Sequence, residues 1–230
     1  MAAGIRSEMV EFPTDGTPMP AFLARPEGDG PLPGVVVVQE WWGLDGHIKD
    51  VAQRFAREGF AALAPDLYHG RVTSEPGEAQ TLMMSLDMNR ASRELTKAAD
   101  YLASQPVTRG RGIGATGFCM GGGLALTLAC DSPHIRAAAP FYGANPNPID
   151  KVQGIGGPVF AVYAEHDEWA GAAVREALEQ ALRQRGKTLE TKTYPGTQHA
   201  FFNDTRRDVY NEGAAKDAWS RVLSLFRANL

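Results

Sequence analysis

Cys119 lies at the centre of the segment GFCMG (residues 117–121), which has the spacing of a G-x-S-x-G nucleophile elbow with cysteine in place of serine. A β-like run at 113–116 precedes it and a helix-forming run at 124–129 follows. The two glycines of the motif suit a turn so tight that a Cβ would collide with neighbouring backbone. The pattern predicts a nucleophilic thiol at a helix N-terminus, where the partial charge of the helix lowers the thiol pKa. The alternative is a small, inert cysteine buried in a glycine-rich turn.

A nucleophilic thiol needs a base, and the base needs a group that orients it. Asp167 directly follows a β-like run at 159–164, and His199 lies in the loop between the last expected strand and the last expected helix. Each residue alone could be a turn, cap or surface residue. Together they stand in the chain order nucleophile, acid, histidine, each at the carboxyl end of a strand, where sites of open α/β sheets collect. The order favours a Cys119–His199–Asp167 triad.

The loop after the aliphatic run 35–39 predicts the remaining catalytic groups. An oxyanion hole would use the backbone N–H of Met120, directly after the nucleophile, and one from this loop, for which Trp41 is the candidate. Glu40 in the same loop is unusual, because a carboxylate at the end of a central aliphatic strand is costly unless it is partnered or used. A salt bridge to a nearby arginine is the alternative to a catalytic role.

Strands and helices alternate along the chain. This pattern predicts an α/β fold with a mostly parallel central sheet, helices on both faces, and antiparallel edge strands from an N-terminal hairpin with an Asp-Gly turn. The segment 143–158 is too short for a large cap domain. The expected strands are residues 7–12, 19–25, 35–39, 60–64, 113–116, 137–142, 159–164 and 190–194, and the expected helices are 48–58, 89–104, 124–129, 172–185 and 209–227.

The composition sets bounds on the function. With 230 residues and a net charge of −4, the chain fits a single domain over residues 1–230 and carries no basic stripe for nucleic acid or a membrane surface. Its aliphatic runs are too short to span a bilayer. Residues 1–4 lack the features of a secretory signal. Cys119 and Cys130 are separated by roughly 16 Å of helix, which is too far for a disulfide. Free thiols predict a reducing, cytoplasmic location.

The chain carries five motifs in order, which are QE-x-x-G at 39–43, PDLY at 65–68, GFCMGG at 117–122, EHD at 165–167 and HAF at 199–201. Together they make the chain similar to the dienelactone hydrolase family, the carboxymethylenebutenolidases. The resemblance implies an α/β-hydrolase fold without a cap, hydrolysis of a small-molecule ester or lactone by the Cys119 triad, and no metal or organic cofactor. It also implies that Glu40 contacts the resting thiol and keeps it unreactive until substrate enters.

The chain departs from the family where the well-studied members bind the carboxylate of their substrate with two arginines. Asn203 stands at one of these positions, and the segment 74–80 offers no arginine for the other. Arg71 and Arg206 are possible substitutes. Because a bidentate arginine strongly favours carboxylates, its loss predicts an aromatic, less cationic pocket for neutral esters or lactones. The candidate substrate-binding residues are Trp42, Tyr68, Arg71, Trp169, Phe201 and Asn203.

The expected mechanism is acyl transfer through a thioester acyl-enzyme. His199 would take the proton of Cys119, and water activated by His199 would later release the acid. Since thiolates leave a tetrahedral intermediate readily, enol lactones and activated aryl esters should react best. Two alternatives remain open: a non-catalytic ligand-binding member of the fold, and a thioesterase or acyltransferase that uses the same triad. The expected assembly is a monomer or a small homo-oligomer.

Overall fold

The computed structural model describes residues 4–28 and 30–230, so the expectation about a leader at residues 1–3 lies outside the described part. Eight strands form one sheet in the order β1-β2-β4-β3-β5-β6-β7-β8. The hairpin β1–β2 and the pair β2–β4 are antiparallel, and the other pairs are parallel. The strands are β1 (Ile5–Phe12), β2 (Met19–Pro26), β3 (Gly34–Val38), β4 (Ala61–Pro65), β5 (Ile113–Phe118), β6 (Ile135–Phe141), β7 (Val159–His166) and β8 (Leu189–Gln198).

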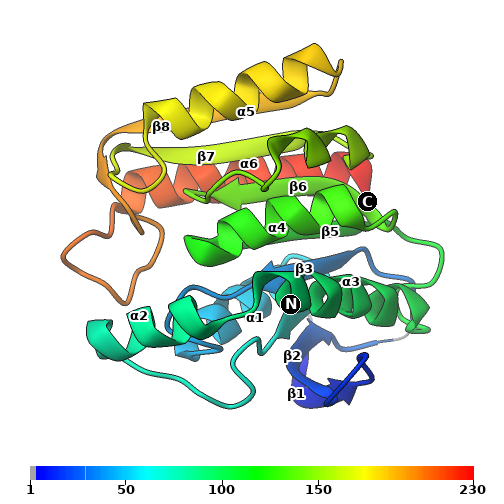
Figure 1. Ribbon diagram of the computed structural model, residues 1–230. Helices are drawn as coiled ribbons and strands as arrows, with labels where there is room; N and C mark the ends of the chain where they lie inside the picture. Colours follow the sequence, from blue (N-terminus) through cyan, green and yellow to red (C-terminus); the bar gives the residue numbers. More distant parts are fainter. Residues whose placement is uncertain (1–3, 29) are drawn as a thin grey trace.

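Helices cover both faces of the sheet (Figure 1), which is why the central strands read as uninterrupted apolar runs. Every residue of β3, β4 and β5 is buried. On one face α1 meets α6, where the ring of Phe55 lies 4.5 Å from that of Trp219. On the other face α3 packs beside α4. The helices are α1 (Gly46–Arg57), α2 (Pro76–Ser85), α3 (Met88–Ser104), α4 (Met120–Asp131), α5 (Ala172–Gln184) and α6 (Glu212–Asn229), with a 3-10 helix η1 (Ile149–Gly154).

This architecture confirms the expected α/β fold, with a mostly parallel sheet, antiparallel strands at one edge and helices on both faces. Two elements were not expected, α2 and η1. Helix α2 buries only Ala79 and Leu82, so its sequence carries almost no amphipathic period to detect. The last helix begins at Glu212 and not near Val209, because the side chain of Asn211 accepts a hydrogen bond from the N–H of Ala214 and caps the helix there.

In the described part of the chain, no helix combines the length and the apolar composition that crossing a membrane requires.

Candidate active site

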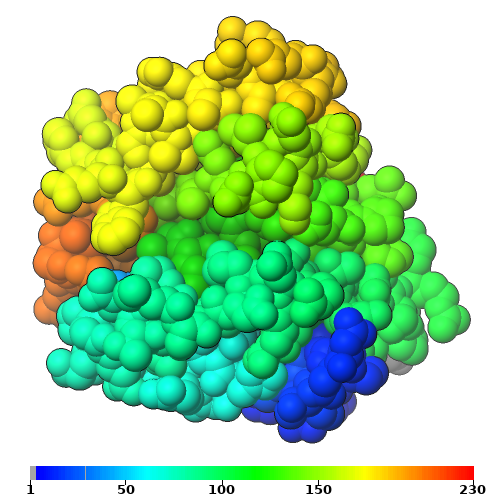
Figure 2. All heavy atoms as spheres, in the orientation of Figure 1, coloured from blue at the N-terminus to red at the C-terminus, as the bar shows by residue number. Residues whose placement is uncertain are grey.

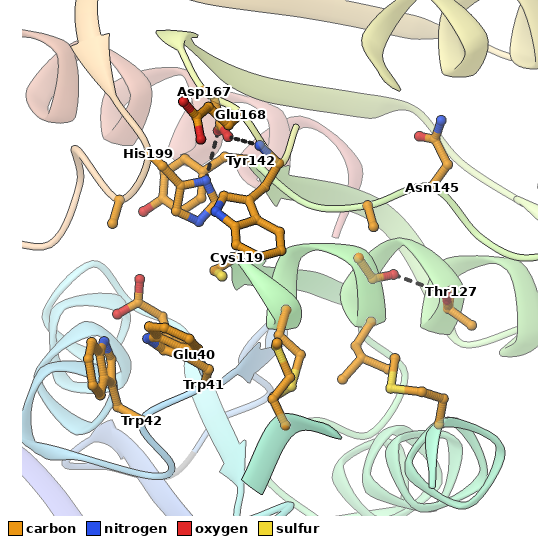
Figure 3. A pocket seen from close by; sticks show the side chains of 18 of the residues that line it. Glu40, Trp41, Trp42, Cys119, Thr127, Tyr142, Asn145, Asp167, Glu168 and His199 are labelled. Carbon is orange, nitrogen blue, oxygen red and sulfur yellow. Dashed lines mark hydrogen bonds and ion pairs between the residues drawn. The ribbon is translucent and has the colours of Figure 1, made fainter. Parts of the chain in front are cut away.

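Cys119, Asp167 and His199 directly follow three parallel strands, β5, β7 and β8, so the sheet brings them to one edge (Figure 3). Cys119 sits between β5 and α4 with φ 57° and ψ −120°, a backbone conformation that L-residues avoid. Such strain persists only where the surroundings enforce it and is concentrated at functional sites. The elbow expected at Cys119 is therefore present in the fold.

The glycines around Cys119 explain how the strained turn is enforced. A Cβ on Gly117 would lie 2.2 Å from the carbonyl oxygen of Gly121, and one on Gly121 would lie 2.3 Å from that of Gln39. Both distances are far below van der Waals contact, so only glycine fits at either position. Because Gly121 lets α4 start against the end of β3, the elbow and the loop that carries Glu40 are held together.

The histidine is oriented by the aspartate. Nδ1 of His199 donates a hydrogen bond of 2.8 Å to Oδ2 of Asp167, whose side chain has no exposed area. The other oxygen, Oδ1, accepts bonds of 2.9 Å from the N–H groups of Trp169 and Ala170. Burial alone would raise the pKa of Asp167, but these hydrogen bonds outweigh it and lower the pKa below its ordinary value. An ionised Asp167 fixes the proton of His199 on Nδ1 and leaves Nε2 with its lone pair.

Nε2 of His199 is buried and has no hydrogen-bond partner among the described residues. In Figure 3 the imidazole ring lies over the thiol of Cys119. Both residues line the same cavity, and a nitrogen without a partner is free to act as a general base there.

Glu40 is buried and is held by Asn203, not by an arginine. Nδ2 of Asn203 donates a bond of 2.7 Å to Oε2 of Glu40, while Oδ1 of Asn203 accepts bonds from the N–H and the hydroxyl of Thr205. These bonds fix which end of the amide faces the carboxylate. Burial raises the pKa of Glu40 to about 7, and the hydrogen bond from Asn203 only partly offsets that effect. Glu40 therefore titrates near neutral pH.

The thiol of Cys119 is not acidified in this resting arrangement, and the expectation of a lowered pKa is wrong. Burial and, after it, the charge of Glu40 raise its pKa to about 12, although the N–H of Met120 acts in the opposite direction. The helix N-terminus is present, but the cost of ionising a buried thiol beside a carboxylate exceeds its effect. At neutral pH Cys119 is a protonated thiol.

Tyr142, which sequence reasoning did not single out, completes this edge of the sheet. It follows β6 with φ 37°, lines the cavity, and its ring lies 4.8 Å from that of His199. Its hydroxyl is buried without a partner among the described residues. The signal was its position directly after a parallel strand, as for Cys119 and His199.

These side chains open into a cavity of about 1180 Å³, seen in Figure 2 as a hollow floored by the green atoms of the chain's middle. Trp41, Trp42 and Trp169 line it, and Trp169 is largely exposed. Four of the candidates for substrate binding, Arg71 among them, do not line it. Phe201 is fully buried, Asn203 bonds to Glu40, and Tyr68 lies behind the wall, where its hydroxyl donates to the sulfur of Met120.

The two arginines considered as substitutes differ in position. Arg206 lines the cavity and pairs with Asp208 at 2.7 Å. Arg71 does not line it, and its guanidinium instead pairs with Glu78 on the surface. No group of three or more His, Cys, Asp or Glu side chains in the described residues is arranged to hold a metal ion.

The N–H groups of Met120 and Trp41 donate to no backbone carbonyl among the described residues. Both residues line the cavity beside Cys119. N–H groups that no backbone carbonyl engages, directly after Cys119 and after β3, fit the requirement of an oxyanion hole.

A mostly parallel sheet with an elbow after β5, an acid after β7 and a histidine after β8 defines an α/β-hydrolase. The family model of the dienelactone hydrolase family matches residues 19–230, and the chain belongs to that family. Two relatives support this. "Protein usf" of Aquifex pyrophilus is 36% identical over 97% of this chain and 99% of its own. A "Putative carboxymethylenebutenolidase" of Saccharolobus solfataricus is 37% identical over 94% and 96%.

Solved structures agree with this assignment. The crystal structure of a dienelactone hydrolase-like promiscuous phosphotriesterase from metagenomic libraries has a TM-score of 0.90, with 25% identity and 98% of both chains covered. Membership of this family makes the chain a carboxylic ester or lactone hydrolase that acts on a small molecule.

Proposed function

We propose that the chain is a cysteine-nucleophile hydrolase that cleaves lactones or activated carboxylic esters through a thioester acyl-enzyme on Cys119. The observation that carries the proposal is the strained backbone of Cys119, φ 57°, in a cavity that it shares with a histidine oriented by Asp167. A buried cysteine with only a packing role has no need of such a conformation, which costs on the order of 1–3 kcal/mol.

The proposed reaction begins with proton transfer from the thiol of Cys119 to Nε2 of His199. The sulfur attacks the ester or lactone carbonyl, and the N–H groups of Met120 and Trp41 stabilise the resulting oxyanion. Collapse of the tetrahedral intermediate expels the alcohol or enolate, which takes the proton from His199. Water, deprotonated by His199, then attacks the thioester, and the acid leaves with Cys119 protonated again.

Glu40 is proposed to keep the thiol protonated until substrate enters. Its charge lies close enough to raise the pKa of Cys119, and its own pKa of about 7 means that a small change in its surroundings alters its charge. A protonated thiol is much less open to oxidation than a thiolate. The free thiols of Cys119 and Cys130 support a reducing, cytoplasmic location.

The cavity supports a neutral substrate. Arg206 is the one arginine among its lining residues, and Asp208 partly neutralises it. The carboxylate of Glu40 also faces the same space and would repel a substrate anion. Three tryptophans and several apolar side chains provide most of the remaining surface.

The test compares wild type, Cys119→Ala and Cys130→Ala on p-nitrophenyl acetate and on cis- and trans-dienelactone. Cys119→Ala should lower kcat/KM by at least about 10³-fold. Cys130→Ala removes a thiol from the other end of the same helix, and its kcat/KM should stay close to that of wild type. Retention of more than a few per cent by Cys119→Ala would overturn the proposal. Turnover of the aryl ester but not of dienelactone would support neutral substrates, and Cys119-dependent turnover of dienelactone would assign carboxylate binding to Arg206.

A further inference from the structure

The cavity extends far beyond the catalytic groups. It follows α4 away from Cys119, past Met120, Leu124 and Thr127, all of which line it. At 1.5 Å per residue, Cys119 and Thr127 are about 12 Å apart along the helix axis. The cavity volume of about 1180 Å³ exceeds the usual range for sites of small ligands. A compact lactone at Cys119 would leave this extension, called here the α4 groove, empty.

The walls of the α4 groove near its middle are apolar and adaptable. Met83 of α2 and Met88 of α3 line one side, opposite Ala144 of the loop after β6. Met88 is about half exposed, so its side chain can contact a ligand that enters the groove. Methionine side chains are flexible and polarisable, so they fit ligands of variable shape. Figure 2 shows the hollow between the cyan atoms of α2 and α3 and the yellow-green atoms above them.

The apolar surface ends at a polar cluster. Asn145, Asn147 and Lys151 line the far part of the groove. The ammonium of Lys151 lies 3.4 Å from Asp131, which also accepts a bond of 2.7 Å from the hydroxyl of Ser92. This Ser92–Asp131–Lys151 bridge joins α3, α4 and η1 and limits the length of an apolar group that can be buried. The oxygen Oδ1 of Asn145 is buried and has no partner among the described residues.

We infer that the substrate of this site is an ester or lactone with a flexible, medium-length apolar chain that lies along the α4 groove. The inference rests on the proposed function, because the groove is continuous with the space beside Cys119. Each methylene that moves from water into the groove favours binding, and the polar cluster excludes the end of a much longer chain. Selectivity should therefore increase with chain length and then fall.

The first test measures kcat/KM for p-nitrophenyl acetate, butyrate, octanoate and palmitate, each below its micellar concentration. Wild type should prefer octanoate over acetate by about tenfold or more and should be slower on palmitate than on octanoate. A monotonic fall from acetate onwards would overturn the inference.

The second test fills the groove. Thr127→Trp should lower the octanoate-to-acetate ratio of kcat/KM by about tenfold, because the indole occupies the space of the chain. Thr96→Trp is the matched control. Thr96 is also half-buried on a helix and makes the same hydrogen bond to the carbonyl four residues earlier, but it does not line the cavity. It should keep the wild-type ratio. An equal ratio in both variants would overturn the inference.

A third variant keeps the inference testable if Thr127→Trp does not fold. Met88→Asp changes an exposed position and places a charge against the acyl chain of the substrate. It should therefore also lower the octanoate-to-acetate ratio of kcat/KM. Cys119→Ala separates the two proposals. If hydrolysis of acetate depends on Cys119 but shows no response to chain length or to these variants, the groove inference fails and the proposed function stands. If hydrolysis does not depend on Cys119, the proposed function itself fails.

Discussion

The two ends of helix α4 each carry a cysteine, and they differ in what surrounds the sulfur. Cys119 precedes the helix with φ 57°, lines the cavity and lies under His199. Cys130, in the last turn, donates to the carbonyl oxygen of Leu126 at 3.2 Å and does not line this cavity. Burial raises the pKa of both thiols to about 12. Resting acidity therefore does not distinguish the proposed nucleophile, whereas backbone strain and a shared cavity with His199 do.

The two ends of α4 also differ in backbone strain. Of the four non-glycine residues with positive φ in the described chain, three are Cys119, Tyr142 and Ala200. All three lie at the carboxyl edge of the sheet, as do Asp167 and His199. At the C-terminal end of α4 the backbone has no positive φ among the described residues. The side chains of Cys130 and Asp131 there have hydrogen-bond or ion-pair partners. Positive-φ backbone therefore gathers at the end where the chemistry is proposed, as expected for a functional site.

The largest expected effect on stability comes from disrupting the close packing of Gly121, at the start of α4, against the end of β3. Gly121→Ala would put a Cβ 2.3 Å from the carbonyl oxygen of Gln39 and 2.4 Å from that of Val38. Backbone cannot move aside cheaply, so the free energy of unfolding should fall by about 3 kcal/mol or more. Gly123→Ala, with its shortest contact at 3.0 Å, should cost clearly less. Urea unfolding of both variants tests this, and equal losses would contradict the role assigned to Gly121.

The next effect concerns pH and Glu40. Its pKa is raised from 4.5 to about 7 in the folded protein, so the folded state holds the proton more tightly than the unfolded state. Its contribution is therefore most favourable below pH 4.5 and is lost as pH rises towards 7 and above. Glu40→Gln removes the cost of ionising this buried carboxyl group. The free energy of unfolding of the variant should therefore gain about 3 kcal/mol relative to wild type on going from pH 4.5 to pH 8.

Urea unfolding of wild type and Glu40→Gln at several pH values checks this prediction. The glutamine can still accept the hydrogen bond from Asn203, so the difference between the two proteins isolates the charge. A difference that does not change with pH would show that Glu40 is already ionised at low pH.

The smallest expected effect separates the two thiols directly. Because the charge of Glu40 raises the pKa of Cys119 and does not act on Cys130, Glu40→Gln should speed alkylation of Cys119 by iodoacetamide about tenfold at pH 8. Cys130 serves as the internal reference in the same sample. Peptide mapping gives both rates, and an unchanged or slower rate at Cys119 would remove the gating role of Glu40.

The sequence allowed most of the fold and the grouping of the candidate site residues to be predicted. Apolar runs such as residues 35–39 and the glycines around Cys119 are local signals, and the rule that sites lie at the carboxyl ends of parallel strands connects Asp167 to His199 across the chain. The elbow, the succession of strands and helices along the chain and the hairpin at the edge all followed from such patterns.

What could not be predicted depends on contacts between distant segments. The partner of Glu40 is Asn203, more than a hundred and sixty residues away, and no local pattern links them. Helix α2 has no clear period, so the methionine wall of the α4 groove was not foreseen. The raised pKa of Cys119 arises from burial and from Glu40, both of which require the packed structure.

The most direct measurement is to locate the acyl group during turnover. Wild type is mixed with p-nitrophenyl acetate, quenched with acid within the first turnovers, digested and mapped by mass spectrometry. The proposed mechanism predicts one acetyl group on Cys119, removed by neutral hydroxylamine as a thioester, with Cys130 unmodified. Acetylation of another residue at the rate of turnover, with Cys119 unmodified, would contradict the mechanism.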